Sequence, residues 1–187
     1  LSRRQRQMCI RDSDLVRRLN LAAITVLNNK NHILPLHTDK EQTIALLEVG
    51  DPGETDALAK QLSRYTSLAR FSLRANQTKE ENQRLRDSLS TYKRIIVAVS
   101  EQRLAPYQPF FAKFVPESPA IYLFFTPGKM MLQIQRAVAH ASAVVLGHSY
   151  SSDVQRQVAD VLFAKASADG QLSASPVSYT HLTLPTT

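Results

Sequence analysis

The sequence has little of what disulfides, metal sites and membrane spans require. Among its 187 residues there is one cysteine, Cys9, so neither a disulfide within the chain nor a cysteine-based metal site is predicted. No apolar run approaches the roughly 20 residues that cross a bilayer, so no membrane span is expected. Four of the five histidines lie before residue 176, at no spacing that is typical of zinc, and no metal site is predicted from them. They are His32, His37, His140 and His148.

Glycine is also scarce, with five residues in the whole chain. A nucleotide site in an α/β protein needs a glycine-rich turn between a strand and a helix, so that the backbone can approach phosphate. Only residues 48–56, EVGDPGETD, come near this pattern, and three carboxylates stand among the glycines: Asp51, Glu54 and Asp56. Carboxylates repel phosphate at a helix N-terminus but suit the helix dipole. We therefore expect a tight turn here, and no nucleotide or other cofactor.

Both ends of the chain differ from the rest. The peptides RRQRQMCIRDS (residues 3–13) and VSYTHLTLPT (residues 177–186) can be encoded by the two strands of one DNA duplex. That duplex resembles a transposase-type sequencing adapter, so residues 1–13 and 176–187 are predicted to be adapter-derived tails around one native domain, residues 14–175. The alternative for the first tail is a basic targeting arm, since transit peptides are also rich in arginine and poor in acids.

The first tail carries much of the basic character of the chain. It holds four arginines and one aspartate: Arg3, Arg4, Arg6, Arg11 and Asp12. Without these charges the formal net charge falls from +7 to +4. The other lysines and arginines form no stripe with interleaved aromatic residues, so no nucleic-acid partner is predicted.

Residues 14–175 have the length of one domain, and short apolar runs alternate in them with amphipathic segments. Three of the five apolar runs are almost continuously apolar, which is typical of strands covered on both faces of a parallel sheet. The pattern predicts an α/β three-layer sandwich, with a mostly parallel sheet of about five or six strands and helices on both faces, as in flavodoxin-like proteins. The predicted strands are Thr43–Val49, Ser67–Leu73, Arg94–Ser100, Ala120–Thr126 and Ser142–Gly147. The predicted helices lie around Leu58 to Tyr65, Leu85 to Tyr92, Met130 to Val138 and Val154 to Leu162.

Several local signals accompany these elements. Thr78 and Glu81 form a capping box that predicts the start of the second helix. His140 is expected to be a cation at a helix C-terminus. A group of aromatic residues with helical spacing is interpreted as core: Tyr107, Phe110, Phe111 and Phe114.

Three carboxylates allow a comparison with signalling domains of similar architecture. Glu48, Asp51 and Glu101 lie at the ends of the first and third predicted strands, where phosphoacceptor domains carry acids. The lysine expected after a later strand is missing, since that loop offers only Lys129, already at the next helix. We interpret the three carboxylates as solvated loop residues.

Two segments resemble the second domain of glycoside hydrolase family 3. The first is ITVLNNKNHILPL, residues 24–36, where the family typically reads like S-x-x-L-L-K-N-x-x-x-x-L-P-L; Asn28 stands where the family commonly has lysine. The second is residues 143–172, where the family has an apolar strand, a short polar loop, a helix and then a motif like A-x-x-L-F-G-x-x-x-x-x-G-x-L-P-V. In this motif Ala164 replaces the glycine of the family and Ser173 replaces its proline. The matching residues are Leu27, Asn29, Leu34, Pro35 and Leu36, and then Ala159, Leu162, Phe163, Gly170 and Leu172.

The resemblance looks closest to the β-N-acetylhexosaminidase-like branch and implies a part of a retaining β-glycosidase. In the family the nucleophile is an aspartate on a preceding (β/α)₈ barrel, which is absent here, so the expected partners are that barrel and a carbohydrate substrate. Some members use a glutamate of the second domain as the acid/base, but neither Glu101 nor Glu117 can be matched to it. No catalytic residue is therefore assigned, and the fragment alone is expected to be inactive. A periplasmic or secreted location is preferred to a cytoplasmic one.

One loop is the candidate for substrate binding. His148, Ser149 and Tyr150 follow the last predicted strand, at the edge where open α/β sheets place their functional loops. Ser151 or Ser152 suffices to cap the helix that follows, so these three residues are left for another role. Together with the resemblance, this predicts that they face the barrel or the bound sugar. The alternative for the whole chain is a free-standing flavodoxin-like binding or signalling module.

Overall fold

The computed structural model describes residues 2–114 and 120–166. These residues form a six-stranded sheet with the strand order β1-β6-β5-β4-β2-β3. Strands β2 to β6 are parallel to one another, and β1 pairs antiparallel with β6. The predicted mostly parallel sheet and all five predicted strands are confirmed. The strands are β1 (Thr25–Asn29), β2 (Asp39–Val49), β3 (Thr66–Leu73), β4 (Ile95–Val99), β5 (Ile121–Phe124) and β6 (Ala143–Leu146).

Strand β1 is the one strand of this sheet that the sequence does not predict. Two of its five residues are asparagines, which are unfavourable in strands, and only Val26 among them is buried. Its register with β6 is also irregular between Val26 and Asn28. Pairing with β6, and not local propensity, makes this segment a strand.

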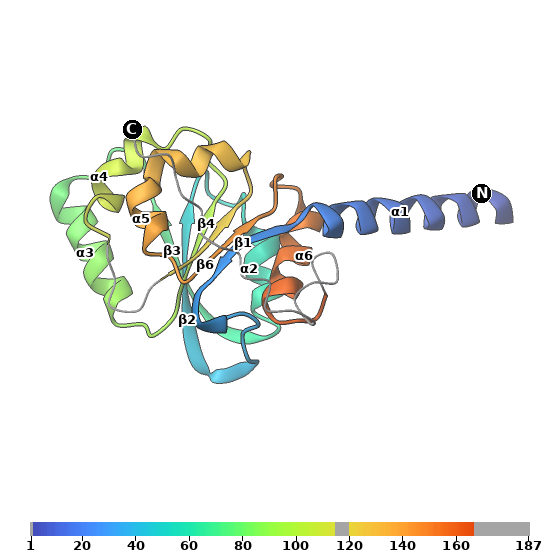
Figure 1. Cartoon of the computed structure of the whole chain (residues 1–187), viewed down its shortest axis with the longest axis horizontal. Helices are drawn as coiled ribbons and strands as arrows, with labels where there is room; N and C mark the ends of the chain where they lie inside the picture. The colour runs from blue at the N-terminus through green and yellow to red at the C-terminus, as the bar shows by residue number, and fades with distance from the viewer. Residues whose placement is uncertain (1, 115–119, 167–187) are drawn as a thin grey trace.

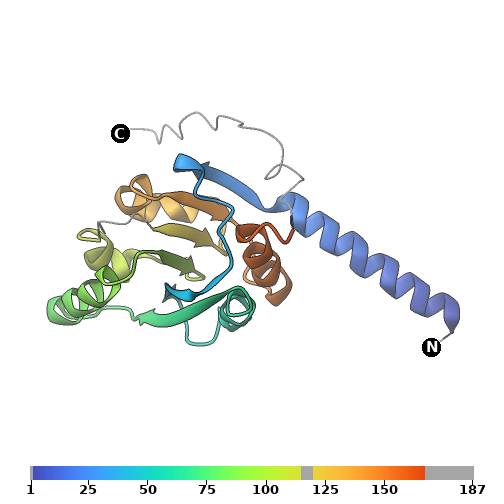
Figure 2. The same cartoon turned by 90° about the horizontal axis from the view of Figure 1, so that it is seen from below.

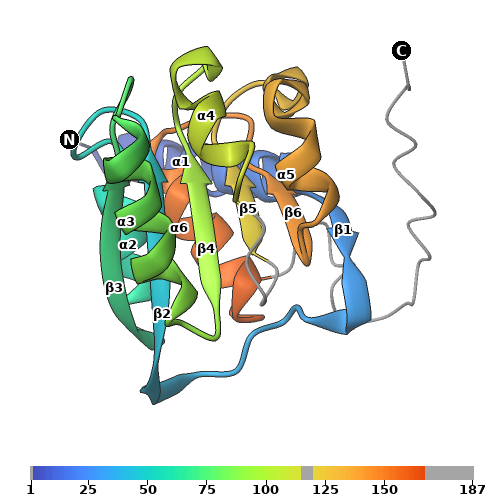
Figure 3. The ribbon, with the colours of Figure 1, turned by 90° about the vertical axis from the view of Figure 1, so that its left-hand side faces the viewer.

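Helices cover both faces of the sheet, which confirms the predicted three-layer sandwich. Helices α2 (Asp56–Leu62) and α6 (Ser152–Leu162) lie on one face. Helices α3 (Lys79–Ser90), α4 (Gln108–Phe111) and α5 (Gln135–Ala139) lie on the other, and Figure 3 shows these three in front of the sheet. All five residues of β4 are buried, because the strand packs against both helical layers.

The local signals are mostly confirmed. Thr78 and Glu81 form the predicted capping box of α3, and His140 is the C-cap residue of α5. The four aromatic residues predicted as core are all buried, on the face of α3 to α5. The helix predicted from Met130 to Val138 is instead a 3₁₀ helix, η3 (Gly128–Ile134), followed by α5. The backbone of Ile134 leaves the helical region, with φ −126° and ψ 36°, and this separates the two pieces.

Helix α1 (Arg3–Ala23) extends away from the sandwich, as Figures 1 and 2 show. None of its residues is fully buried, and its contact with the core comes near its end, where Leu21 packs against the α2 and α6 layer. The adapter origin of residues 1–13 stays a prediction, and residues 176–187 lie outside the described part of the chain. None of the described helices has the length and apolarity of a membrane span.

The two segments that resemble glycoside hydrolase family 3 come together in the structure. The side-chain amide of Asn29 donates to the carbonyl of Leu34 at 3.1 Å and accepts from its N–H at 2.9 Å. This closes the loop that contains the 3₁₀ helix η1 (Lys30–His32) and orients Leu34 and Leu36 into the core. The N–H of Leu36 then donates to the carbonyl of Leu162 at 2.7 Å. Asn29, Leu34 and Leu36 of the first segment therefore hold it against Leu162 of the second. Gly170 and Leu172 lie outside the described residues.

The end of α6 explains why the family motif has glycine where this chain has Ala164. The N–H of Ala164 donates to the carbonyl of Val161, and that of Lys165 to the carbonyl of Asp160, which is the Schellman pattern of a helix C-terminus. Ala164 has φ +54°, a left-handed conformation in which glycine avoids the steric cost of a Cβ atom. The left-handed backbone at residue 164 therefore explains why glycine is favoured there.

We expect Ala164→Gly to raise the free energy of unfolding by about 0.5–1 kcal/mol, because it removes the left-handed strain of an exposed alanine. Urea denaturation monitored by circular dichroism would measure the change. As the matched control, Ala57→Gly inside α2 is expected to lower the free energy of unfolding by a similar amount. A loss of stability on Ala164→Gly would contradict this account of the helix end.

Candidate functional site

The carboxyl ends of the parallel strands meet at one edge of the sheet, and the loops that follow them form the candidate site. Open α/β sheets bind ligands at this edge, at the point where the strand order reverses. Here the chain runs from β2 to β3 and then returns past β2 to β4, so the reversal lies between β2 and β4.

The protein's own side chains occupy this reversal point. The hydroxyl of Ser100, directly after β4, donates to a carboxylate oxygen of Glu54 at 2.6 Å. Gly50 lies beneath this pair with φ +149°, and a Cβ atom there would come within 2.1 Å of the Ser100 hydroxyl. Glycine at residue 50 therefore serves internal packing. A phosphate placed here would displace the Ser100 hydroxyl and meet the Glu54 carboxylate.

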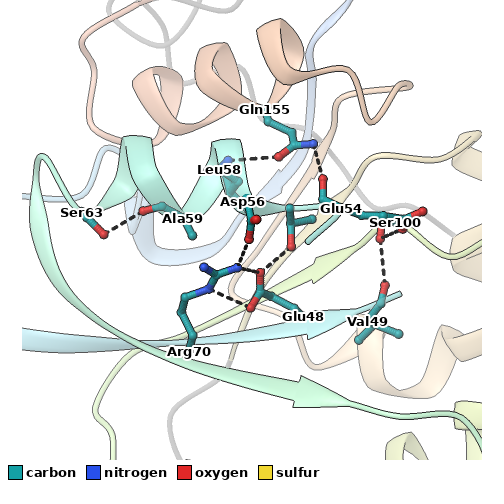
Figure 4. Close-up of polar contacts among 11 residues, drawn as sticks. Glu48, Val49, Glu54, Asp56, Leu58, Ala59, Ser63, Arg70, Ser100 and Gln155 are labelled. Carbon is teal, nitrogen blue, oxygen red and sulfur yellow. Dashed lines mark hydrogen bonds and ion pairs between the residues drawn. The ribbon is translucent and has the colours of Figure 1, made fainter. Parts of the chain in front are cut away.

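A second polar cluster joins β2, β3 and α2 (Figure 4). The guanidinium of Arg70 donates to both carboxylate oxygens of Glu48, at 2.7 and 3.0 Å, and to Asp56 at 2.6 Å. The Thr55 hydroxyl adds a hydrogen bond of 2.6 Å to Glu48. These carboxylates raise the pKa of Arg70, with Glu48 the larger contributor. The cluster fixes the start of α2 above the sheet.

The interpretation of Glu48, Asp51 and Glu101 as solvated loop carboxylates is wrong for Glu48. The Glu48 side chain is 13% exposed and ion-paired to Arg70, since β3 brings a cation to it that the local sequence does not reveal. Asp51 is exposed, and Glu101 is half-buried. Among residues 2–114 and 120–166, no group of three histidine, cysteine, aspartate or glutamate side chains is arranged to hold a metal ion.

Tyr107 lies in the electrostatic field of the acids at this edge. Burial raises the pKa of its phenol, and the nearby carboxylates Glu101, Asp51 and Glu54 raise it further. Its ring belongs to the core beneath the loops. The phenol therefore stays protonated at neutral pH.

Gln155 of α6 ties three segments of the site together, and Figure 4 shows its contacts with Leu58 and Glu54. Its side-chain oxygen accepts from the N–H of Leu58, in the first turn of α2, at 3.0 Å. Its side-chain nitrogen donates to the carbonyls of Glu54 and Tyr150, both at 2.7 Å. The side chain is buried, with 1% of the residue exposed. Gln155 thus caps a neighbouring helix and fixes the loops after β2 and β6 relative to each other.

We expect Gln155→Leu to lower the free energy of unfolding by about 2–3 kcal/mol, because it leaves a buried N–H and two carbonyls without partners. Gln157 on the same helix is the matched control, since its side-chain oxygen is buried with no partner among the described residues. Gln157→Leu is therefore expected to be neutral or stabilising. Urea denaturation of both variants makes the comparison, and equal losses would show that Gln155 is ordinary packing.

The three predicted binding residues lie together in the loop after β6. His148, Ser149 and Tyr150 are all exposed, and Ser151 caps α6 by accepting from the N–H of Val154. The Ser149 hydroxyl accepts from the N–H of Ser151 at 3.1 Å, so it contributes to the turn as well. That these residues bind substrate stays a prediction.

His148 has two features that the sequence does not reveal. Its backbone is left-handed, with φ +66°, a conformation that costs a non-glycine residue about 1–2 kcal/mol. Its Nε2 atom lies 3.4 Å from the hydroxyl of Thr25 on β1. Strain of this kind is concentrated at functional sites. Thr25 is the residue that sequence reasoning missed, and no local signal indicates it.

A scan against protein-family models and a search of the curated proteins find no match to this sequence. Among solved structures, the chain is similar to a fungal multi-domain family 3 (GH3) β-N-acetylglucosaminidase, with 12% identity and a TM-score of 0.67 over 84% of this chain and 18% of that one. It is also similar to a family 3 β-N-acetylglucosaminidase from Paenibacillus sp. str. FPU-7, with 18% identity and a TM-score of 0.61 over 85% of this chain and 31% of that one. A β-glucosidase from Listeria innocua has 15% identity and a TM-score of 0.62 over 80% of this chain and 24% of that one.

These similarities show a shared fold. The chain spans less than a third of the length of each of these three structures.

Proposed function

We propose that this chain is the α/β domain of a retaining β-glycosidase of glycoside hydrolase family 3, of the β-N-acetylhexosaminidase or β-glucosidase type. In this proposal it is an ancillary domain, and a (β/α)₈ barrel elsewhere in the complete protein carries the nucleophile. The observation that carries the proposal is that four fifths or more of the chain share the fold of three such enzymes. The two segments that resemble the family lie side by side within this fold, joined by the bond from Leu36 to Leu162.

The carboxylates of the candidate site support an ancillary role. Retaining cleavage needs a nucleophile and an acid/base whose carboxyl groups are about 5–5.5 Å apart and both face the sugar. Glu48 and Asp56 bind Arg70, and Glu54 binds Ser100. These three carboxylates hold the domain together and are not available as a catalytic pair.

The same contacts disfavour the free-standing flavodoxin-like module. The order of β2 to β6 is that of a flavodoxin-like sheet, but a nucleotide or phosphate ligand would need the reversal point between β2 and β4. Ser100 and Glu54 fill that point with a hydroxyl and a carboxylate. The geometry therefore favours a domain whose surface contacts another part of a larger enzyme.

The purified chain is expected to show no turnover of chromogenic β-N-acetylglucosaminides or β-glucosides, because it lacks the barrel that carries the nucleophile of the two-carboxylate mechanism. A longer protein that adds a barrel before residue 14 is expected to hydrolyse one of them. Turnover that co-purifies with the isolated chain, and that disappears when one of its own carboxylates is changed, would overturn the proposal.

His148→Gly is expected to raise KM in the barrel-containing protein or to weaken domain docking, because it removes the imidazole. The isolated domain should keep its stability, since glycine adopts φ +66° without strain. His148→Ala should have the same effect on KM but keeps the left-handed strain, so it serves as the matched variant. Steady-state kinetics and thermal unfolding give the two readouts. Unchanged kinetics and unchanged docking in both variants would show that this loop is ordinary surface.

A further inference from the structure

Thr25 connects the end of α1 to the loop after β6. The antiparallel pairing of β1 with β6 places Thr25 opposite Leu146, two residues before His148. The Thr25 hydroxyl lies 3.0 Å from the carbonyl of Ala23, the last residue of α1, and 3.4 Å from Nε2 of His148. One hydroxyl therefore bridges the end of a helix and the imidazole of the candidate binding loop.

The chemistry of the three groups fixes the direction of both hydrogen bonds. A carbonyl oxygen only accepts, and a hydroxyl has one hydrogen to donate. The shorter contact, to Ala23, takes that hydrogen, so a lone pair of the hydroxyl faces the imidazole. A hydrogen bond to His148 then requires the hydrogen on Nε2. In a neutral imidazole this leaves Nδ1 as the acceptor.

We propose that Thr25 is a positioning residue that holds His148 in the Nε2–H tautomer, so that Nδ1 is kept free as a hydrogen-bond acceptor for a ligand. His148 is exposed, and Nδ1 has no hydrogen-bond partner among the described residues. The ligand group that it receives is therefore a donor, such as a sugar hydroxyl or an acetamido N–H. The identification of the ligand as a carbohydrate rests on the proposed function, whereas the tautomer does not.

The backbone geometry agrees with a positioning role. The left-handed conformation of His148 is unfavourable for histidine, so the loop holds this residue at a cost that glycine would avoid. A second constraint on the side chain, from Thr25, then restricts the ring as well as the backbone. An imidazole held at both ends is preorganised for one ligand geometry.

The test uses long-range ¹H–¹⁵N correlation spectra of the chain labelled with ¹⁵N-histidine, with His148→Gly to assign the signals of residue 148. In the wild type at a pH where the ring is neutral, the Nε2–H form is expected to dominate. Thr25→Val keeps the shape and the strand preference but removes the hydroxyl, and it is expected to lower the ratio of Nε2–H to Nδ1–H forms about fivefold, which corresponds to about 1 kcal/mol for one hydrogen bond. Thr25→Ser keeps the hydroxyl and is expected to restore the wild-type ratio.

A dominant Nδ1–H form in the wild type would overturn the proposal without any variant, and so would an unchanged ratio in a folded Thr25→Val chain. The ligand is tested separately in the barrel-containing protein, where Thr25→Val is expected to raise KM and Thr25→Ser to restore it. If the tautomer responds as expected but KM does not, Thr25 still positions His148, and the carbohydrate role of the loop is wrong.

Discussion

The structure depends on a parallel sheet that is apolar on both faces and therefore stable only between two helical layers. Strand β4 shows the constraint most directly, because Ile96 and Ala98 face the layer of α2 and α6 while Val97 and Val99 face the layer of α3 to α5. The apolar side chains of the sheet are therefore buried against one helical layer or the other. Polar side chains are then displaced to the ends of the strands.

The polar groups at the carboxyl edge are largely satisfied by one another. Arg70 pairs with two carboxylates, Ser100 binds Glu54, and Gln155 joins the first turn of α2 to two loops. These side chains are hydrogen-bonded to one another or to the backbone, and a network of this kind holds loops in one arrangement. It fixes the loops after β2 and β6 and the first turn of α2, next to the exposed residues 148–150.

Strand β1 connects the end of α1 to the loop after β6 and to the end of α6. Its antiparallel pairing with β6 brings the end of α1 next to His148, and the loop after it joins the end of α6 through Leu36. The first and last elements of the described domain therefore stabilise each other.

The sequence by itself determined the fold class, all five parallel strands, the capping box of α3, the aromatic core and the position of the candidate loop. These features follow from local patterns of apolar residues and from caps whose partners lie within a few residues. Tertiary structure alone decided the pairing of β1, the ion pair between Glu48 and Arg70, and the contacts of Gln155 and Thr25. Gln155 and Leu58 are 97 residues apart, and Thr25 and His148 are 123 residues apart. Hydrogen bonds over such separations leave no periodicity in the sequence, because their partners become neighbours only when the sheet brings distant strands together.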